Sequence, residues 1–290
     1  MSSLFAHIKN IFSGNHSHAD SDDPLFSRHG KVGISLSGGA ALGYAHIGVL
    51  QAIDEVGIRL GCITGTSMGA IMGMMYAAGY KPQEIRKIVK DEKMNHLAVL
   101  ALPGLHHKGG IVSTERIQRI LLHYVPHNNF DRLPTRFYCC TSNMNTLKPV
   151  YRGHGDQLVQ YVMASAAMPA VFAPVSIQNE YYVDGGIHDN LPIQPLIDEQ
   201  CDTRIASYLT IEKPGKADNP LTMWLHAYSY CTYATSFRHL SRFDHVIPVD
   251  PDKYWLNDFK HIDELYEIGY HAGKRYFKEL RKKGKTHGDF

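Results

Sequence analysis

The sequence predicts an α/β fold in which a mostly parallel β-sheet lies between two layers of helices, a three-layer sandwich. Short runs of β-branched residues alternate along the chain with amphipathic helical patterns, an order typical of parallel sheets. Glycine-rich turns connect the first two expected strands to the helices that follow them. With 290 residues, 44% hydrophobic and 20% charged, the chain is long enough to bury a sizeable core.

The expected elements follow this alternation. A strand is expected at 31–36, and the helix expected at 42–56 has apolar residues at helical spacing. A short strand at 61–64 then leads into a methionine-rich helix at 68–78 and a further helix at 82–92. The other strands are expected at 137–142, 148–152, 171–177, 181–183, 204–211 and 245–249, and the other helices at 113–124, at 156–165, from Pro192, from Leu221 and at 263–283.

Domain organisation is expected to be simple, because no linker or internal repeat divides the chain. Residues 30–250 are expected to form one catalytic domain, and 251–290 a C-terminal helical extension packed on it. Residues 1–29 are rich in histidine and aspartate and lack a signal-peptide layout, so we expect a disordered or loosely docked tail there.

Charge and cysteine content exclude several classes of function. The chain has 30 basic and 28 acidic residues, so no strong field favours nucleic acid. Five cysteines without a C-x-x-C pair argue against a disulfide framework and a structural zinc site, and favour a reducing, cytoplasmic compartment. No apolar run approaches the length of about 18 residues that a membrane-spanning helix needs.

Residues 65–69 read Gly-Thr-Ser-Met-Gly and contain the first candidate catalytic residue, Ser67. An apolar strand pattern runs into this stretch and a helical pattern runs out, the layout of a nucleophile elbow. Gly65 and Gly69 permit the sharp turn that holds the serine Oγ at a helix N-terminus. We therefore expect Ser67 to attack a carbonyl carbon, although the pattern alone also fits an ordinary glycine-rich turn.

A second glycine-rich turn precedes the first and contains Gly38, Gly39, Ala40 and Gly43. Small residues between a strand and a helix leave backbone N–H groups available to an anion. The stretch lacks a Walker lysine and the G-x-G-x-x-G spacing, which disfavours a nucleotide phosphate. An oxyanion hole is the better interpretation, and a tight packing turn is the alternative.

A third candidate, Asp184, ends an apolar strand pattern and precedes Gly185 and Gly186. A carboxylate there would enter a site built at the strand ends, although Asp-Gly is also a common turn sequence. A conventional serine hydrolase would need a histidine base. No local pattern distinguishes one among the downstream histidines His188, His226, His239, His245, His261 and His271.

Together these motifs resemble the patatin-like phospholipase family. The resemblance rests on the glycine loop with residues 45–50, on residues 65–70, on residues 164–172, and on Asp184-Gly185-Gly186 with Asn190 and Pro192. It covers residues 31–195, and more weakly the chain to about residue 250.

The resemblance implies a lipid acyl hydrolase that uses a Ser67–Asp184 dyad, without metal or cofactor. Asp184 would accept the serine proton and later activate the deacylating water, and the N–H groups of Gly38, Gly39 and Ala40 would stabilise the oxyanion. Gly43, Gly65, Gly69, Gly185 and Gly186 would shape the motifs. The implied substrate is a phospholipid or another acyl ester. Two alternatives stay open: a Ser-His-Asp hydrolase of small esters or thioesters, and a weakly active lipid-binding or regulatory member of the fold.

The chain departs from the family at Leu42, where many members carry arginine or lysine, and at Ala40, where a third glycine is common. Loss of the cation removes a source of positive potential, so we expect Leu42→Arg to raise turnover of short acyl esters.

Three segments are candidate contact surfaces. The apolar run 97–105 is a candidate lid or lipid-contacting loop, and a buried segment explains it as well. The aromatic stretch 224–243 is a candidate homodimer surface, and core packing explains it equally well. Cations near the C-terminus are candidate contacts for anionic lipid in a peripheral membrane protein, namely Arg281, Lys282, Lys283 and Lys285.

Overall fold

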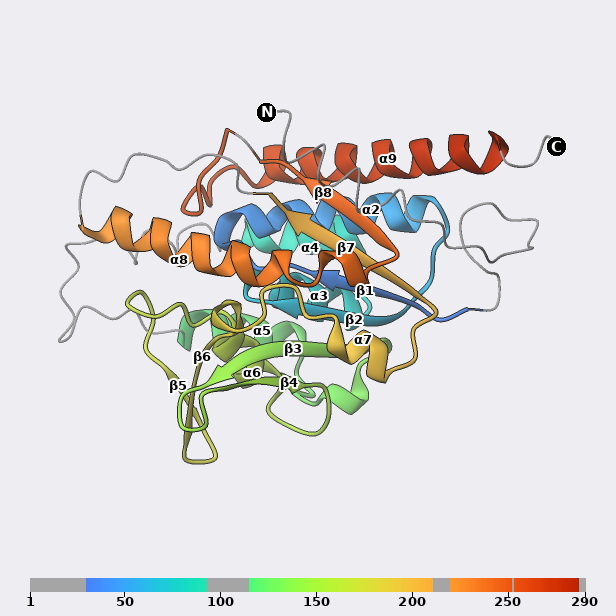
Figure 1. Ribbon diagram of the computed structural model, residues 1–290. Helices are drawn as coiled ribbons and strands as arrows, with labels where there is room; N and C mark the ends of the chain where they lie inside the picture. Colours follow the sequence, from blue (N-terminus) through green and yellow to red (C-terminus); the bar gives the residue numbers. More distant parts are fainter. Residues whose placement is uncertain (1–29, 93–114, 211–219, 252, 287–290) are drawn as a thin grey trace.

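A mixed eight-stranded sheet crosses the middle of the computed structural model, which describes residues 30–92, 115–210, 220–251 and 253–286 (Figure 1). The strand order is β5-β6-β3-β2-β1-β7-β8, with β4 paired to β3. The central strands are parallel, and β4, β5 and β6 pair in antiparallel fashion. The strands are β1 (Val32–Leu36), β2 (Leu60–Thr66), β3 (Arg136–Asn143), β4 (Lys148–Arg152), β5 (Val175–Ile177), β6 (Glu180–Asp184), β7 (Thr203–Leu209) and β8 (His245–Val249).

Alternate residues of the central strands enter two cores, one on each face of the sheet. In β1, Ile34 and Leu36 belong to the larger core, whereas Gly33 faces Leu196 and Cys201 of the smaller one. Burial on both faces explains why these strands read as nearly continuous apolar runs. The predicted three-layer α/β sandwich is therefore confirmed.

Helices cover both faces of this sheet. The larger core is covered by α2 (Ala45–Glu55), α3 (Met68–Ala77), α4 (Pro82–Asp91), α5 (Glu115–Tyr124), α6 (Leu158–Ser165) and α9 (Ile262–Thr286), and the smaller core by α7 (Gln194–Asp198) and the C-terminal end of α8 (Pro220–Phe237). Short 3-10 turns are η1 (Ala40–Tyr44), η4 (Phe130–Arg132), η5 (Gly185–Ile187) and η6 (Leu240–Arg242).

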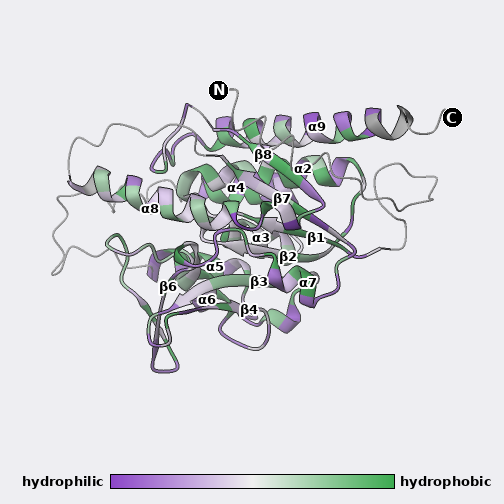
Figure 2. Cartoon of the chain, viewed as in Figure 1, coloured by the Kyte–Doolittle hydropathy of each residue, from purple (hydrophilic) through white to green (hydrophobic). Residues whose placement is uncertain are grey.

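Helix α9 packs closely along α2, and hydrophobic and hydrophilic residues alternate along its length (Figure 2). Gly48 of α2 and Gly269 of α9 permit this contact, because a Cβ on either would collide with the backbone of the other helix. No described helix is long and apolar enough to cross a membrane.

Two expected elements differ from the structure. Residues 171–174 are not a strand, because the Val171 and Phe172 amides bond to the Met168 carbonyl in a turn where Ala170 has φ 63°. Pro192 does not begin a helix; its carbonyl accepts a bond from Thr64 Oγ1, and α7 starts at Gln194. The expectations for 1–29 and 97–105 lie outside the described residues.

Candidate active site

Ser67 occupies a strained turn between β2 and α3. Its backbone has φ 55° and ψ −126°, a combination that L-residues adopt only when their surroundings enforce it. Its N–H donates to Ser165 Oγ at 2.9 Å, and Ser165 Oγ donates in turn to the Cys140 carbonyl at 2.6 Å. The turn is therefore fixed from β3 and α6 as well as by its own glycines.

Close backbone packing explains the glycines on either side of Ser67. A Cβ on Gly65 would lie 2.6 Å from the Gly69 carbonyl oxygen, and a Cβ on Gly69 would collide with the carbonyls of Leu36 and Ser37. Backbone atoms cannot swing away as flexible side chains do, so neither position accepts a larger residue without moving a strand. The spacing places Ser67 at the end of β2, next to the end of β1.

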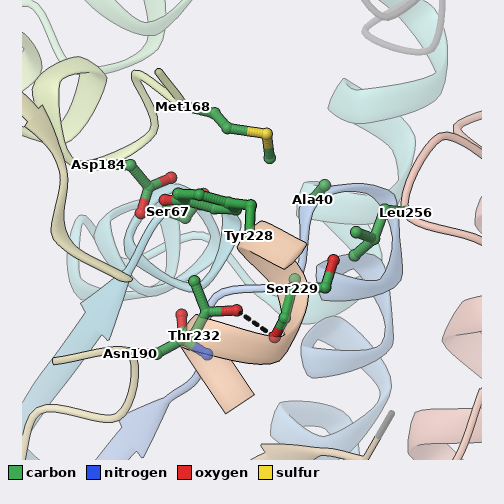
Figure 3. A pocket seen from close by; sticks show the side chains of 10 residues that line it. Ala40, Ser67, Met168, Asp184, Asn190, Tyr228, Ser229, Thr232 and Leu256 are labelled. Carbon is green, nitrogen blue, oxygen red and sulfur yellow. Dashed lines mark hydrogen bonds between the residues drawn. The ribbon is translucent and has the colours of Figure 1, made fainter. Parts of the chain in front are cut away.

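Asp184 reaches the same place from the end of β6. Its Oδ1 accepts the Gly186 N–H at 2.7 Å, and its backbone carbonyl accepts a bond from Ser142 Oγ at 2.9 Å. A Cβ on Gly185 would collide with the Cys140 carbonyl, so this turn too is packed tightly on β3. Asp184 and Ser67 both line one pocket and face each other there (Figure 3).

Burial raises the pKa of Asp184 to about 6, because the low-dielectric surroundings disfavour the charged form. The hydrogen bond from the Gly186 N–H and the nearby Ser67 and Tyr228 hydroxyls partly offset this shift. The carboxylate is thus ionised at neutral pH and more basic than an exposed aspartate. This is the pKa range in which a carboxylate is an effective general base.

The glycine loop forms a third side of the pocket. Gly39 and Ala40 line it, and Ala40 has φ 45°. The Gly38 N–H donates to the Asn190 carbonyl at 3.2 Å, so this donor is already used within the protein. No described residue accepts a hydrogen bond from the Gly39 or Ala40 amide. These two amides are free donors beside Ser67.

His46 and Asn190 hold the glycine loop in place. The fully buried His46 contacts the Ser37 carbonyl through Nε2 and Ser207 Oγ through Nδ1, each at 2.8 Å. Burial lowers the pKa of His46 to about 4, so the ring is neutral, with its proton on the nitrogen that faces the carbonyl. Asn190 Nδ2 donates to the Gly38 carbonyl and to Ser236 Oγ.

Helix α8 supplies a wall of the pocket that the sequence motifs did not indicate. Tyr228, Ser229 and Thr232 line the cavity from this helix, and the Tyr228 side chain extends toward Asp184 and Ser67 (Figure 3). The Tyr228 hydroxyl is buried and makes no hydrogen bond of ordinary geometry within the described residues. It nevertheless lies close enough to Asp184 to lower the pKa of that carboxyl.

The space enclosed between these walls is small. The cavity measures about 20 Å³, and Met168 and Leu256 contribute its apolar lining. That volume holds about one water molecule and no acyl chain. The pocket as it stands is therefore too small to hold a lipid substrate.

No histidine lines this pocket among the described residues. His188 bonds to Ser142 Oγ at 2.8 Å, His245 to the Tyr276 hydroxyl and His261 to Glu264. His226 stacks on Trp255. Asp184 is thus the side chain facing Ser67 that could accept its proton.

Leu42 corrects an expectation. Its side chain is 3% exposed and packs in the larger core, away from the pocket lining. An arginine at this position would have to bury its charge in apolar surroundings. The burial of Leu42 favours a loss of stability over the expected gain in turnover for Leu42→Arg.

Sequence reasoning found the pocket residues that belong to motifs and missed those of α8 and the loop after β8. Tyr228, Ser229 and Thr232 carry no local pattern, and Leu256 is one apolar residue in a loop. The only available signal was the run of hydroxyl residues in 228–236, which recur at helical spacing.

Comparison with known proteins agrees with this geometry. The family model of the patatin-like phospholipases matches residues 34–197. An uncharacterized NTE family protein of Mycobacterium bovis is 32% identical over 200 residues, which cover 68% of this chain and 55% of that protein. The lysophospholipase nte1 of Aspergillus terreus is 27% identical over 285 residues, covering 87% of this chain. This chain spans only 18% of the length of that fungal relative.

The fold also matches a solved structure. The crystal structure of VipD from Legionella pneumophila gives a TM-score of 0.54 at 16% identity, covering 89% of this chain and 68% of VipD. At that identity the likeness concerns the fold alone.

Proposed function

The chain belongs to the patatin-like phospholipase family, and on that premise we propose that it is a serine hydrolase of lipid acyl esters, acting through a Ser67–Asp184 dyad. The observation that carries the proposal is the buried pairing of Ser67 with a carboxylate whose pKa is raised to about 6, beside two free backbone amides. The absence of histidine from the described pocket lining favours this dyad over a Ser-His-Asp triad.

In the proposed acylation step, Ser67 Oγ attacks the ester carbonyl carbon while its proton passes to Asp184. The carbonyl oxygen becomes an oxyanion, which the N–H groups of Gly39 and Ala40 stabilise. Preorganised donors of this kind contribute about 3 kcal/mol each to the transition state. The intermediate then collapses, the C–O bond to the alcohol breaks, and the leaving oxygen takes the proton from Asp184.

Deacylation repeats the sequence with water. A water molecule gives its proton to Asp184 as its oxygen bonds to the acyl carbon, the Ser67 ester bond breaks, and the serine oxygen recovers the proton. The acyl group leaves as a fatty acid. The cavity beside the dyad has room for one such water molecule.

The proposed substrate is a phospholipid or lysophospholipid presented by a membrane or micelle. The fungal relative is named a lysophospholipase, which favours this class over small soluble esters. All five cysteines are free, which fits work in a reducing cytoplasm.

The test is labelling by a fluorophosphonate, together with fatty acid release from lysophosphatidylcholine and phosphatidylcholine. Ser67→Ala should abolish labelling and reduce release by at least about 1,000-fold. Ser229→Ala is the matched control, because that serine lines the same pocket from α8 and should still be labelled at Ser67. Labelling that persists in Ser67→Ala would refute the proposed nucleophile, and a labelled wild type that releases no fatty acid would refute a lipid substrate.

A further inference from the structure

Helix α8 has an arrangement opposite to that of an ordinary surface helix. Its hydroxyl residues face inward: Ser229, Thr232, Thr235 and Ser236 are buried. Thr235 Oγ1 accepts the Asn190 N–H, and Ser236 Oγ accepts a bond from Asn190 Nδ2, so this side is tied to the loop after Asp184.

The outward side of α8 is apolar instead. Met223 is 56% exposed and Tyr230 is 77% exposed. The exposed residues recur every three or four positions, so they form one stripe along the helix. The stripe, hereafter the α8 outer face, consists of Pro220, Met223, Ala227, Tyr230, Cys231 and Ala234.

No charged residue lies anywhere in the sequence of α8. Surface helices of globular proteins usually turn charged or polar residues to water, as α9 does with its lysines, arginines and glutamates. An apolar outer face is not stabilised by contact with water, and an uncharged helix makes no ion pairs with a charged partner. Its chemistry suits an uncharged apolar surface.

The location of the α8 outer face points to the nature of that surface. The inner side of the same helix closes the pocket through Tyr228, Ser229 and Thr232. The cavity of about 20 Å³ is too small for an acyl chain, so a lipid substrate requires a wall of the pocket to shift, and α8 forms one of these walls. A surface that binds the outer side of α8 could therefore change the access of substrate to Ser67.

We propose that the α8 outer face docks on the apolar–water boundary of a lipid bilayer or micelle, and that this docking admits the substrate to the pocket that α8 closes. The inference rests on the proposed lipid ester hydrolysis. Tyrosine and tryptophan suit such a boundary, because each has an apolar ring and a polar group. Trp255, which stacks on His226 of α8 and is 42% exposed, adds an aromatic ring beside this helix.

Binding is measured without catalysis by using Ser67→Ala and intrinsic fluorescence. The chain has two tryptophans, and both report on α8: Trp224 stacks on Tyr228 within the helix, and Trp255 stacks on His226. Neutral phosphatidylcholine vesicles should shift the emission to shorter wavelength and sediment the protein. Since the helix carries no charge, about 0.5 M salt should not release it.

Charged substitutions on the α8 outer face should weaken this binding. Met223→Glu and Tyr230→Glu are each expected to reduce vesicle partition about tenfold. The matched controls are Met144→Glu and Leu147→Glu, whose side chains are 48% and 71% exposed near the turn between β3 and β4. These controls should change partition by less than about twofold, since surface substitutions are usually close to neutral.

Activity separates docking from chemistry. In the otherwise wild-type enzyme, Met223→Glu and Tyr230→Glu should slow vesicle hydrolysis about as much as they weaken binding. Turnover of a monomeric short-chain ester should be unchanged. If the wild type hydrolyses no lipid while Ser67→Ala still binds vesicles through α8, the proposed function fails and docking stands. If lipid is hydrolysed and the α8 variants bind like the wild type, the docking inference alone fails.

Two further outcomes would overturn the inference. Binding confined to anionic vesicles and abolished by salt would assign docking to a cationic surface such as the end of α9. A wild-type dimer that Tyr230→Glu dissociates, seen by light scattering after size exclusion, would show that a second copy covers the α8 outer face.

Discussion

The two walls of the pocket are built on different principles. The strand-end wall consists of Gly39, Ala40, Ser67 and Asp184, which follow strands of one sheet and are fixed by backbone contacts. The helical wall consists of Tyr228, Ser229 and Thr232 of α8, a helix that Thr235 and Ser236 tie to the loop after Asp184 by hydrogen bonds. The strand-end wall carries the proposed chemistry, and in the docking proposal the helical wall controls what reaches it.

The largest effect is expected at the strand-end wall, for Asp184→Asn. An amide of the same shape keeps the bond from the Gly186 N–H but cannot accept the serine proton. We expect hydrolysis to fall by at least about 1,000-fold, measured as fatty acid release. Activity that survives above about one tenth of wild type would show that Asp184 is not the base.

The same variant should be more stable than wild type at high pH, which serves as its folding control. The pKa of Asp184 is about 6 when folded and near 3.8 when exposed, so the folded state binds the additional proton between these values. The stability contribution of Asp184 is therefore full below pH 4 and lost as the pH rises through 6. Relative to wild type, Asp184→Asn should gain about 3 kcal/mol in unfolding free energy between pH 4 and pH 8. Urea denaturation at both pH values measures this, and a constant difference would contradict the raised pKa.

A smaller effect is expected at the helical wall, for Tyr228→Phe. Loss of the hydroxyl removes a group that favours ionised Asp184, so the pKa of Asp184 should rise further above 6. The acid limb of kcat/KM should then shift to higher pH by about one unit. At pH 6 the rate should fall about fivefold, and above pH 8 it should approach that of wild type.

Tyr230→Phe is the matched control, two residues along the same helix with an exposed ring. Its pH profile should overlay that of the wild type. An unshifted acid limb in Tyr228→Phe would mean that the hydroxyl of the helical wall does not act on the dyad.

The two walls also differ in how far the sequence predicts them. A Cβ on Gly65 would collide within the motif itself and one on Gly69 with the end of β1, and the five-residue motif was enough to predict Ser67 at a strand end. The approach of Asp184, at the end of β6, to Ser67, after β2, was predicted only through family resemblance, because it depends on strand order across the sheet. Tyr228 was missed, since its role depends on how a helix with no distinguishing pattern packs over the sheet.

The same reasoning explains what the motifs could not predict within the strand-end wall. Gly38 is equivalent to Gly39 in sequence, and only the fold shows that its N–H is used by the Asn190 carbonyl. Leu42 occupies a motif position where family members carry a cation, and only the packing shows that its side chain enters the core. Motifs thus predict the path of the backbone better than the direction of each side chain.

The smallest effect is expected for His188→Ala, which tests whether the strand-end wall works without histidine. His188 bonds to Ser142 Oγ, and Ser142 Oγ donates to the Asp184 carbonyl, so the ring supports the aspartate turn from one contact away. Its removal leaves Ser142 free to keep that bond, and the rate of fatty acid release should fall by less than about threefold. Loss as large as that of Asp184→Asn, in a variant with wild-type unfolding behaviour, would restore a histidine-dependent mechanism. A small loss would leave Asp184 as the base. The proton would then pass only between Ser67, Asp184 and the reacting groups, all at the strand-end wall.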